Sequence, residues 1–203
     1  MRKHHSHHAP YPHHLNFEYG FTFIESIITI LLTSVLFFFA QQTYHRFQLS
    51  LHEEILQQNI TKYLKLAKTL ASIENRAITL CGSIDGKNCL PAQNYIWDGW
   101  LLFYDENATF SPEAEKILYY YPPERLSHRG FYLQTTVNIG GGINFSAHRQ
   151  YAYGMARTLP NGRIKLCRMK EENIFLSKPQ SSHYAFIINV YGYFRISKEK
   201  GAC

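Results

Sequence analysis

One carboxylate stands in the most apolar part of the chain. Glu25 is the only charged residue in the twenty-residue run from Phe21 to Ala40, FTFIESIITILLTSVLFFFA. A helix of that length spans roughly 30 Å, the thickness of a membrane's hydrocarbon core. Because an ionisable side chain in lipid costs on the order of 3 kcal/mol, Glu25 is expected to need a partner there. The run therefore predicts a membrane helix that carries one group able to form an ion pair.

The residues around Glu25 also carry a family resemblance. The letters G-F-T-F-I-E from Gly20 to Glu25, followed by the apolar run, resemble the prepilin cleavage motif of type IV pilins and type II secretion pseudopilins. The resemblance implies that a membrane peptidase cuts between Gly20 and Phe21 and that the new amine of Phe21 is methylated. It also implies that Glu25 pairs with the N-terminal amine of a neighbouring subunit during assembly. The alternatives are a single membrane anchor or a signal peptide, which has a shorter apolar core and a small-residue cleavage site.

Four cysteines follow the apolar run, an even number that favours disulfides if this part of the chain is exported. Three pairings are possible. We favour Cys81 with Cys89, which closes a short loop, and Cys167 with Cys203, which ties the C-terminus to the domain. A zinc site is disfavoured because the sequence contains no C-x-x-C pair.

The formal net charge of +6 is unevenly distributed. Residues 81–124 contain seven acids and two bases, whereas the chain from Arg149 onward contains ten bases and three acids. This asymmetry favours ordered contacts between heads or a polyanionic partner. The candidates for contacts with DNA phosphates are Arg163, Lys165, Arg168, Lys170, Arg195 and Lys198.

Strand alternation would place Arg163 and Lys165 on one face of a strand, where they could neutralise phosphates. Nearby aromatic side chains, Tyr191, Tyr193 and Phe194, would add surface on which bases stack. The alternative is a solvated edge strand whose charges keep it from aggregating.

Catalytic signatures are missing from the sequence. It contains no G-x-S-x-G, H-E-x-x-H, P-loop or G-x-G-x-x-G motif, and the run Gly140–Gly142 is interpreted as a mobile loop. His128, His148 and His183 are scattered singly, which does not favour a metal site. Trp97 and Trp100, with Phe103 and Tyr104, are expected to fill the core rather than bind a ligand. We therefore predict neither an enzyme nor a cofactor.

Four segments position these residues. Residues 1–20 are expected to be a leader that is removed, with the true start at Met1 or near Leu15. Residues 21–40 form the membrane helix, and 41–75 continue it as an amphipathic spine, because no Gly or Pro interrupts the chain from Phe21 to Cys81. The buried face of the spine is predicted from apolar residues three and four apart: Leu56, Ile60, Tyr63, Leu64, Ala67, Leu70 and Ala71.

Residues 76–203 are predicted to form one β-rich head, and the fold class is therefore α+β, with a mostly antiparallel sheet or sandwich packed on the spine. Asn161-Gly162 is interpreted as a tight hairpin turn. The expected strands are Trp100–Tyr104, Lys116–Tyr120, Gly130–Val137, Ile143–Phe145, Tyr153–Arg157, Arg163–Arg168, His183–Ile188 and Tyr193–Ile196.

Three runs of the head resemble the GspH/FimT family of minor pilins and pseudopilins, and its FimT/FimU-like branch in particular. They are WDGWLLFYDEN from Trp97, NGRIKLC from Asn161 and FIINVYGYFRI from Phe186. Some FimT members take part in DNA uptake through a C-terminal Gly-Arg-x-Arg element. The matching residues here are Gly192, Tyr193, Phe194 and Arg195, so tyrosine replaces one arginine.

This resemblance implies a minor pilin of the type IV pilus system, held in the inner membrane by a single helix with its head in the periplasm, and later part of the pilus fibre. Its partners would be other pilins, the prepilin peptidase and the membrane. Two alternatives remain open: a GspH-like minor pseudopilin of the type II secretion system, and a dedicated DNA receptor for natural transformation.

Overall fold

The computed structural model describes residues 20–146, 152–156, 159–169, 182–200 and 203. The chain divides into two compact units, Met1–His45 and Arg46–Cys203. The long helix α1, Phe23–Ile73, contributes to both units. The leader predicted for residues 1–20 lies outside the described residues except for Gly20.

Helix α1 has a defined start and a defined end. The hydroxyl of Thr22 accepts a hydrogen bond from the backbone N–H of Glu25 at 3.3 Å, which is the arrangement of an N-cap. Thr22 and Glu25 also match the spacing of a capping box, a signal that the sequence contained. Asn75, with φ of 55°, adopts the left-handed conformation that commonly follows a helix C-terminus. The 51-residue helix therefore confirms the prediction of one continuous element.

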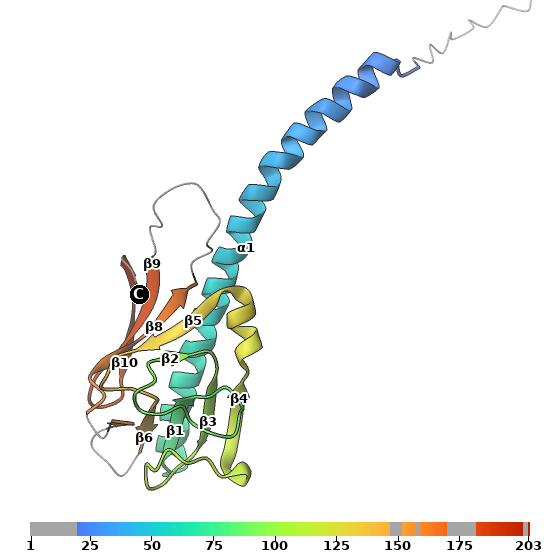
Figure 1. Cartoon of the computed structure of the whole chain (residues 1–203). Helices are drawn as coiled ribbons and strands as arrows, with labels where there is room; N and C mark the ends of the chain where they lie inside the picture. The colour runs from blue at the N-terminus through green and yellow to red at the C-terminus, as the bar shows by residue number, and fades with distance from the viewer. Residues whose placement is uncertain (1–19, 147–151, 157–158, 170–181, 201–202) are drawn as a thin grey trace, which may run out of the picture. The chain divides into compact units, whose positions relative to one another are not determined.

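The C-terminal half of α1 is the spine of the second unit, and both sheets lie along it (Figure 1). Its core-facing residues have the predicted spacing, and Leu56, Leu64 and Ala67 are completely buried. Burying a leucine side chain stabilises a fold by about 2 kcal/mol, so this face accounts for much of the attachment of helix to head. The buried members of the predicted face are Leu56, Ile60, Tyr63, Leu64, Ala67 and Ala71.

The first sheet has five antiparallel strands in the order β4-β3-β1-β6-β7. Their bounds are β1 Ile78–Gly82, β3 Trp100–Tyr104, β4 Ile117–Tyr121, β6 Gly142–Phe145 and β7 Tyr153–Gly154. Every residue of β1 is buried, because it is the central strand and both of its faces are covered.

The second sheet is also antiparallel, in the order β10-β9-β8-β5-β2. Its strands are β2 Ile96–Trp97, β5 Phe131–Thr135, β8 Gly162–Arg168, β9 Ser182–Ile188 and β10 Phe194–Lys200. Three short 3-10 helices complete the described elements: η1 Ala114–Lys116, η2 Pro123–Arg125 and η3 Ser127–Arg129.

One hydrophobic core joins the two sheets to the spine. Tyr63 of α1 stacks on Tyr119 with ring centroids 4.2 Å apart, and Trp100 stacks on Tyr121 at 3.9 Å. Burial and the hydrogen bond with Tyr119 raise the pKa of Tyr63 above its usual range. The aromatic residues of the Trp97–Asn107 run therefore fill the core, and Trp97, Trp100 and Phe103 are not accessible to a ligand.

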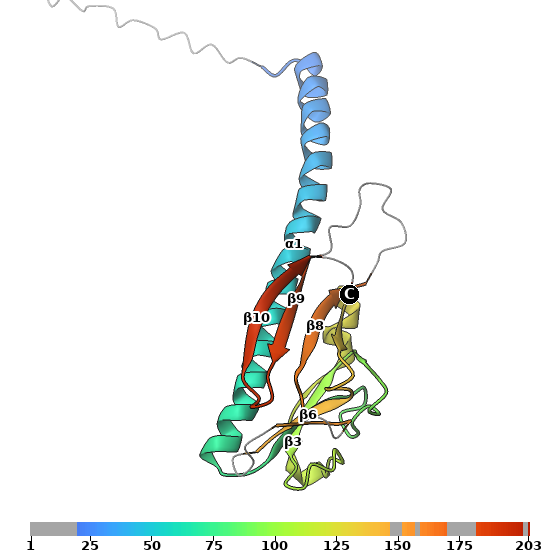
Figure 2. The ribbon, with the colours of Figure 1, turned by 90° about the vertical axis from the view of Figure 1, so that its left-hand side faces the viewer.

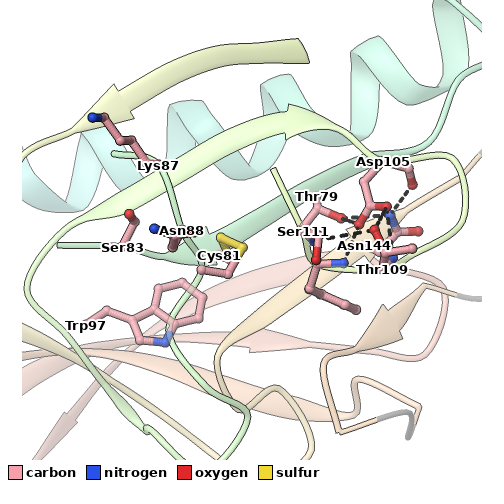
Figure 3. Close-up of a disulfide and its surroundings, with 12 residues drawn as sticks. Thr79, Cys81, Ser83, Lys87, Asn88, Trp97, Asp105, Thr109, Ser111 and Asn144 are labelled. Atoms are coloured by element: carbon pink, nitrogen blue, oxygen red, sulfur yellow. Dashed lines mark hydrogen bonds between the residues drawn. A yellow bond between two sulfur atoms is a disulfide. The ribbon is translucent and has the colours of Figure 1, made fainter. Parts of the chain in front are cut away.

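A buried carboxylate fixes the loop that follows β3 (Figure 3). Asp105 accepts hydrogen bonds from the hydroxyls of Thr79 and Thr109, at 2.9 and 3.0 Å. The backbone N–H groups of Thr109 and Phe110 also donate to it, each at 2.9 Å. The side-chain amide of Asn144 donates to the Asp105 carbonyl oxygen at 3.0 Å, so three strands meet at this residue.

Two predictions about glycines are wrong. Asn161-Gly162 does not form a hairpin, because β7 belongs to the first sheet and β8 to the second, and Gly162 is already the first residue of β8. The run Gly140–Gly142 is buried rather than a mobile loop. A Cβ on Gly141 would lie 2.3 Å from the Leu90 carbonyl oxygen, and Gly140 has a φ of +56°. These glycines allow a close backbone approach that larger residues would block.

Candidate functional site

The predicted processing site lies immediately before α1. Gly20, Phe21 and Thr22 precede the first helical residue, Phe23. Gly20 is exposed, and the Phe21 side chain is 72% exposed. A peptide bond between Gly20 and Phe21 is thus accessible to an enzyme without unwinding the helix.

The N-terminal part of the helix that follows, α1, is apolar and exposed. It is long and apolar enough to cross a membrane by length and composition. Its large side chains are turned outward, with exposed fractions of 81% for Phe23, 68% for Leu36 and 64% for Phe39. Exposed apolar surface of this extent is unfavourable in water.

Glu25 lies in the first turn of α1, where a negative charge interacts favourably with the helix dipole. Its side chain is exposed. In the part of the chain that the structure describes, the Glu25 carboxylate forms no ion pair. The group is therefore sterically accessible to a cation on another molecule.

The head contains two disulfides, and they are the pairings favoured from the sequence. Cys81 bonds to Cys89 with a separation of eight residues, and Cys167 bonds to Cys203 with a separation of 36. Figure 3 shows Cys81 beside the loop that carries Lys87 and Asn88. Within this loop the backbone N–H groups of Asn88 and Lys87 donate to Asp85 and hold the pKa of that carboxyl well below its usual range.

Three of the basic candidates share the outer face of the second sheet. Arg163 and Lys165 alternate with Ile164 and Leu166, which are buried. Arg195 joins them because Ile187 pairs with both Arg163 and Arg195 in the register of β8, β9 and β10. Arg163 is not a free cation, since its guanidinium lies 3.6 Å from the carboxylate of Glu199.

The other basic candidates do not extend this face. The side chain of Lys198 lies on the opposite face of the sheet from that of Arg195, and its ammonium group lies 5.1 Å from the ring centroid of Tyr184. Arg168 belongs to the same face as Lys198, and its guanidinium group lies 5.9 Å from the ring centroid of Phe131. Lys170 lies outside the described residues. Of the six basic candidates, the structure thus brings Arg163, Lys165 and Arg195 together on one face, beside the carboxylate of Glu199.

Two of the aromatic residues proposed for stacking are exposed, but they contact the helix α1. Tyr191 is 56% exposed and Tyr193 is 64% exposed. Lys68 of α1 holds both, because its ammonium group donates to the Tyr191 carbonyl oxygen at 3.0 Å and lies 2.8 Å from the Tyr193 ring centroid. Phe194 packs against the core and is partly buried. Sequence reasoning did not foresee this contact between residues 123 positions apart.

Within the described ranges, no group of three or more His, Cys, Asp or Glu side chains is placed to hold a metal ion. His148 lies outside those ranges, and the side chains of His128 and His183 are not described.

The chain was compared with protein-family models, curated proteins and solved structures, and no match was found in any of the three comparisons. A function is therefore inferred from the sequence and from the geometry of the head and of the start of α1.

Proposed function

We propose that this chain is a minor pilin of the type IV pilus system. In this proposal a prepilin peptidase cuts between Gly20 and Phe21, and the amine of Phe21 is methylated. Helix α1 then holds the protein in the inner membrane with its head in the periplasm. The subunit finally leaves the bilayer by joining a pilus fibre.

The carrying observation is the placement of Glu25. It is the only charged side chain in the exposed apolar part of α1, two residues after the helix begins and four after the proposed new N-terminus. A lone carboxylate in lipid is costly, on the order of 3 kcal/mol, and an amine from a neighbouring subunit would remove that cost. The same charge thus disfavours the isolated subunit and favours the assembled one.

The disulfides of the head are compatible with the proposed location of the head in the periplasm. Disulfides persist in oxidising compartments such as the periplasm. The head contains both disulfides, and its two sheets and the spine bury one shared cluster of side chains.

A GspH-like pseudopilin of type II secretion would use the same assembly chemistry, and no feature of the described head favours that system over a pilus. A DNA receptor receives less support, because Glu199 pairs with Arg163 and Lys198 lies on the other face.

The proposal is tested by replacing Glu25 with alanine in the native host. We expect the variant to reach the membrane in normal amounts and to fall at least about tenfold in the sheared fibre fraction, as the loss of one buried ion pair predicts. Glu54→Ala is the matched control, because Glu54 is an exposed carboxylate of the same helix outside the apolar run. Normal incorporation of Glu25→Ala, or a native product whose amino terminus is uncut, would contradict the proposal.

A further inference from the structure

A groove of about 650 Å³ runs between α1 and β10, within the unit Arg46–Cys203. We call it the edge groove. Its helix side includes Lys65, Lys68 and Thr69, and its strand side is formed by Tyr193, Phe194 and Ile196.

The strand side of the edge groove is a free sheet edge. Strand β10 is the outermost strand of its sheet and lies beside α1 (Figure 2). It pairs with β9 over seven consecutive residues without a bulge, and it contains no proline. Regular edges of this kind accept an added strand unless they are blocked. Among the described residues no further strand pairs with β10.

The hydrogen-bond pattern shows which backbone groups face outward. The N–H of Asn189 donates to the Tyr193 carbonyl oxygen at 2.9 Å. Because antiparallel pairing alternates along a strand, Arg195, Ser197 and Glu199 also direct their N–H and C=O groups to β9. Ile196 and Lys198 then direct theirs to the open edge, where an extended peptide would find a ladder of donors and acceptors.

The helix side of the edge groove is positively charged. Two lysines line the groove, Lys65 and Lys68, and no aspartate or glutamate lines it. Exposed apolar side chains lie beside these charges, since Ile196 is 40% exposed, Tyr193 64% and Ile73 75%. An occupant must therefore match ammonium groups on one side and apolar surface on the other.

We propose that the edge groove binds an extended acidic segment of a partner protein, which adds a strand to β10 and places carboxylates against Lys65 and Lys68. Backbone pairing with β10 supplies the binding geometry, and the lysines select acidic over basic segments. A second copy of this chain is a poorer occupant, because pairing of two β10 strands would bring together two strands that each carry three bases, Arg195, Lys198 and Lys200, and one acid, Glu199. The inference is independent of fibre assembly and does not rest on the proposed function.

The test uses the full chain in detergent micelles and a fluorescein-labelled peptide of seven residues that alternates glutamate with valine. Fluorescence anisotropy is expected to show saturable binding with a Kd below about 100 μM. Two control peptides have the same length: one replaces glutamate with lysine, and the other carries methyl groups on alternate backbone nitrogens. Both are expected to bind at least about tenfold more weakly.

Two protein variants address the two sides of the edge groove. Lys65→Glu should weaken binding by at least about tenfold, whereas Lys62→Glu, an equal charge change on α1 outside the groove, should change it less than about twofold. Ile196→Pro removes an outward N–H and leaves the ladder to β9 intact, so it should also weaken binding by at least about tenfold.

The proposal is wrong if the acidic peptide shows no saturable binding up to about 1 mM. It is also wrong if the methylated peptide binds equally well, or if Lys65→Glu and Lys62→Glu have equal effects. A single-stranded DNA of matching length is the last probe. If it displaces the peptide at lower concentration than unlabelled peptide does, the edge groove is a phosphate site rather than a strand-binding site.

Discussion

At the scale of single residues, Asp105 is the only buried acid among the described residues of the head. Its buried carboxylate accepts four hydrogen bonds, two of them from backbone N–H groups in the loop that follows β3. Two residues of that loop, Ala108 and Phe110, have φ of 52° and 56°, a left-handed conformation that costs free energy for non-glycine residues. The carboxylate therefore holds a loop that would not keep its conformation alone.

We predict that Asp105→Ala lowers the free energy of unfolding by about 3 kcal/mol, because several buried donors lose their acceptor together. Tryptophan fluorescence during denaturation reports this directly, since both tryptophans, Trp97 and Trp100, are buried in the head. Glu113→Ala is the control: that side chain is 68% exposed and pairs with Lys116 at 2.9 Å, so its loss should cost less than about 1 kcal/mol. Equal effects of the two substitutions would show that the Asp105 network does not stabilise the fold.

Glu25 and Asp105 differ in how visible they are in the sequence. Glu25 stands out because it is the only charged residue in the run from Phe21 to Ala40, so a short stretch of sequence is enough to reveal it. Asp105 gains its partners from Thr79, 26 residues earlier, and from Asn144, 39 residues later. No local pattern connects these three residues, and only the pairing of β1 with both β3 and β6 brings them together.

At the scale of elements, α1 and eight strands could be predicted, because their periodicity or their β-branched and aromatic composition is strong. Strand β3, Trp100–Tyr104, has its predicted bounds. The predictions missed β1 and β2 for different reasons. Strand β1 is buried on both faces and shows no alternation, and β2 has only two residues. The hairpin error at Asn161-Gly162 arose because turn chemistry does not reveal that the flanking strands belong to different sheets.

The two disulfides should differ in how much they stabilise the head. Cross-linking acts mainly on the unfolded chain, and the effect grows with the length of the closed loop. For separations of 36 and eight residues the chain-entropy relation gives about 4 and about 2.5 kcal/mol. We predict that replacing both Cys167 and Cys203 with alanine destabilises the head more than replacing both Cys81 and Cys89.

The comparison is controlled, because each pair contains one completely buried cysteine, Cys81 or Cys167. The second cysteines differ, because Cys89 is partly buried and Cys203 is exposed, so the loss of packing is greater for the Cys81/Cys89 variant. A larger destabilisation by the Cys167/Cys203 variant would therefore report loop length. A larger loss for the Cys81/Cys89 pair would indicate that the short loop, with its Asp85 hydrogen bonds, matters more than the entropy of the chain.

At the scale of the whole molecule, the chain combines a unit whose apolar side chains are exposed with a unit that has its own core. The large side chains of the first unit, such as Phe23 and Leu36, are mostly exposed. The second unit, Arg46–Cys203, buries helix and sheet residues in one cluster and holds both disulfides. The boundary between the units falls inside α1, which explains why the sequence shows no linker, glycine or proline at that point.

We predict that a fragment beginning at Arg46 folds without detergent, forms both disulfides and unfolds cooperatively. A fragment beginning at Arg76 should not fold, because it lacks Leu56, Ile60 and Leu64, which complete the core between the sheets. Removing one buried leucine typically costs 2–5 kcal/mol, and the spine contributes several such residues, whereas a domain of this size is stable by only about 5–15 kcal/mol. Circular dichroism during thermal unfolding distinguishes the two fragments.

Cooperative unfolding of the shorter fragment would mean that the sheets are self-sufficient and that α1 is only an anchor. Aggregation of the longer fragment would mean that the apolar unit is needed to fold the head.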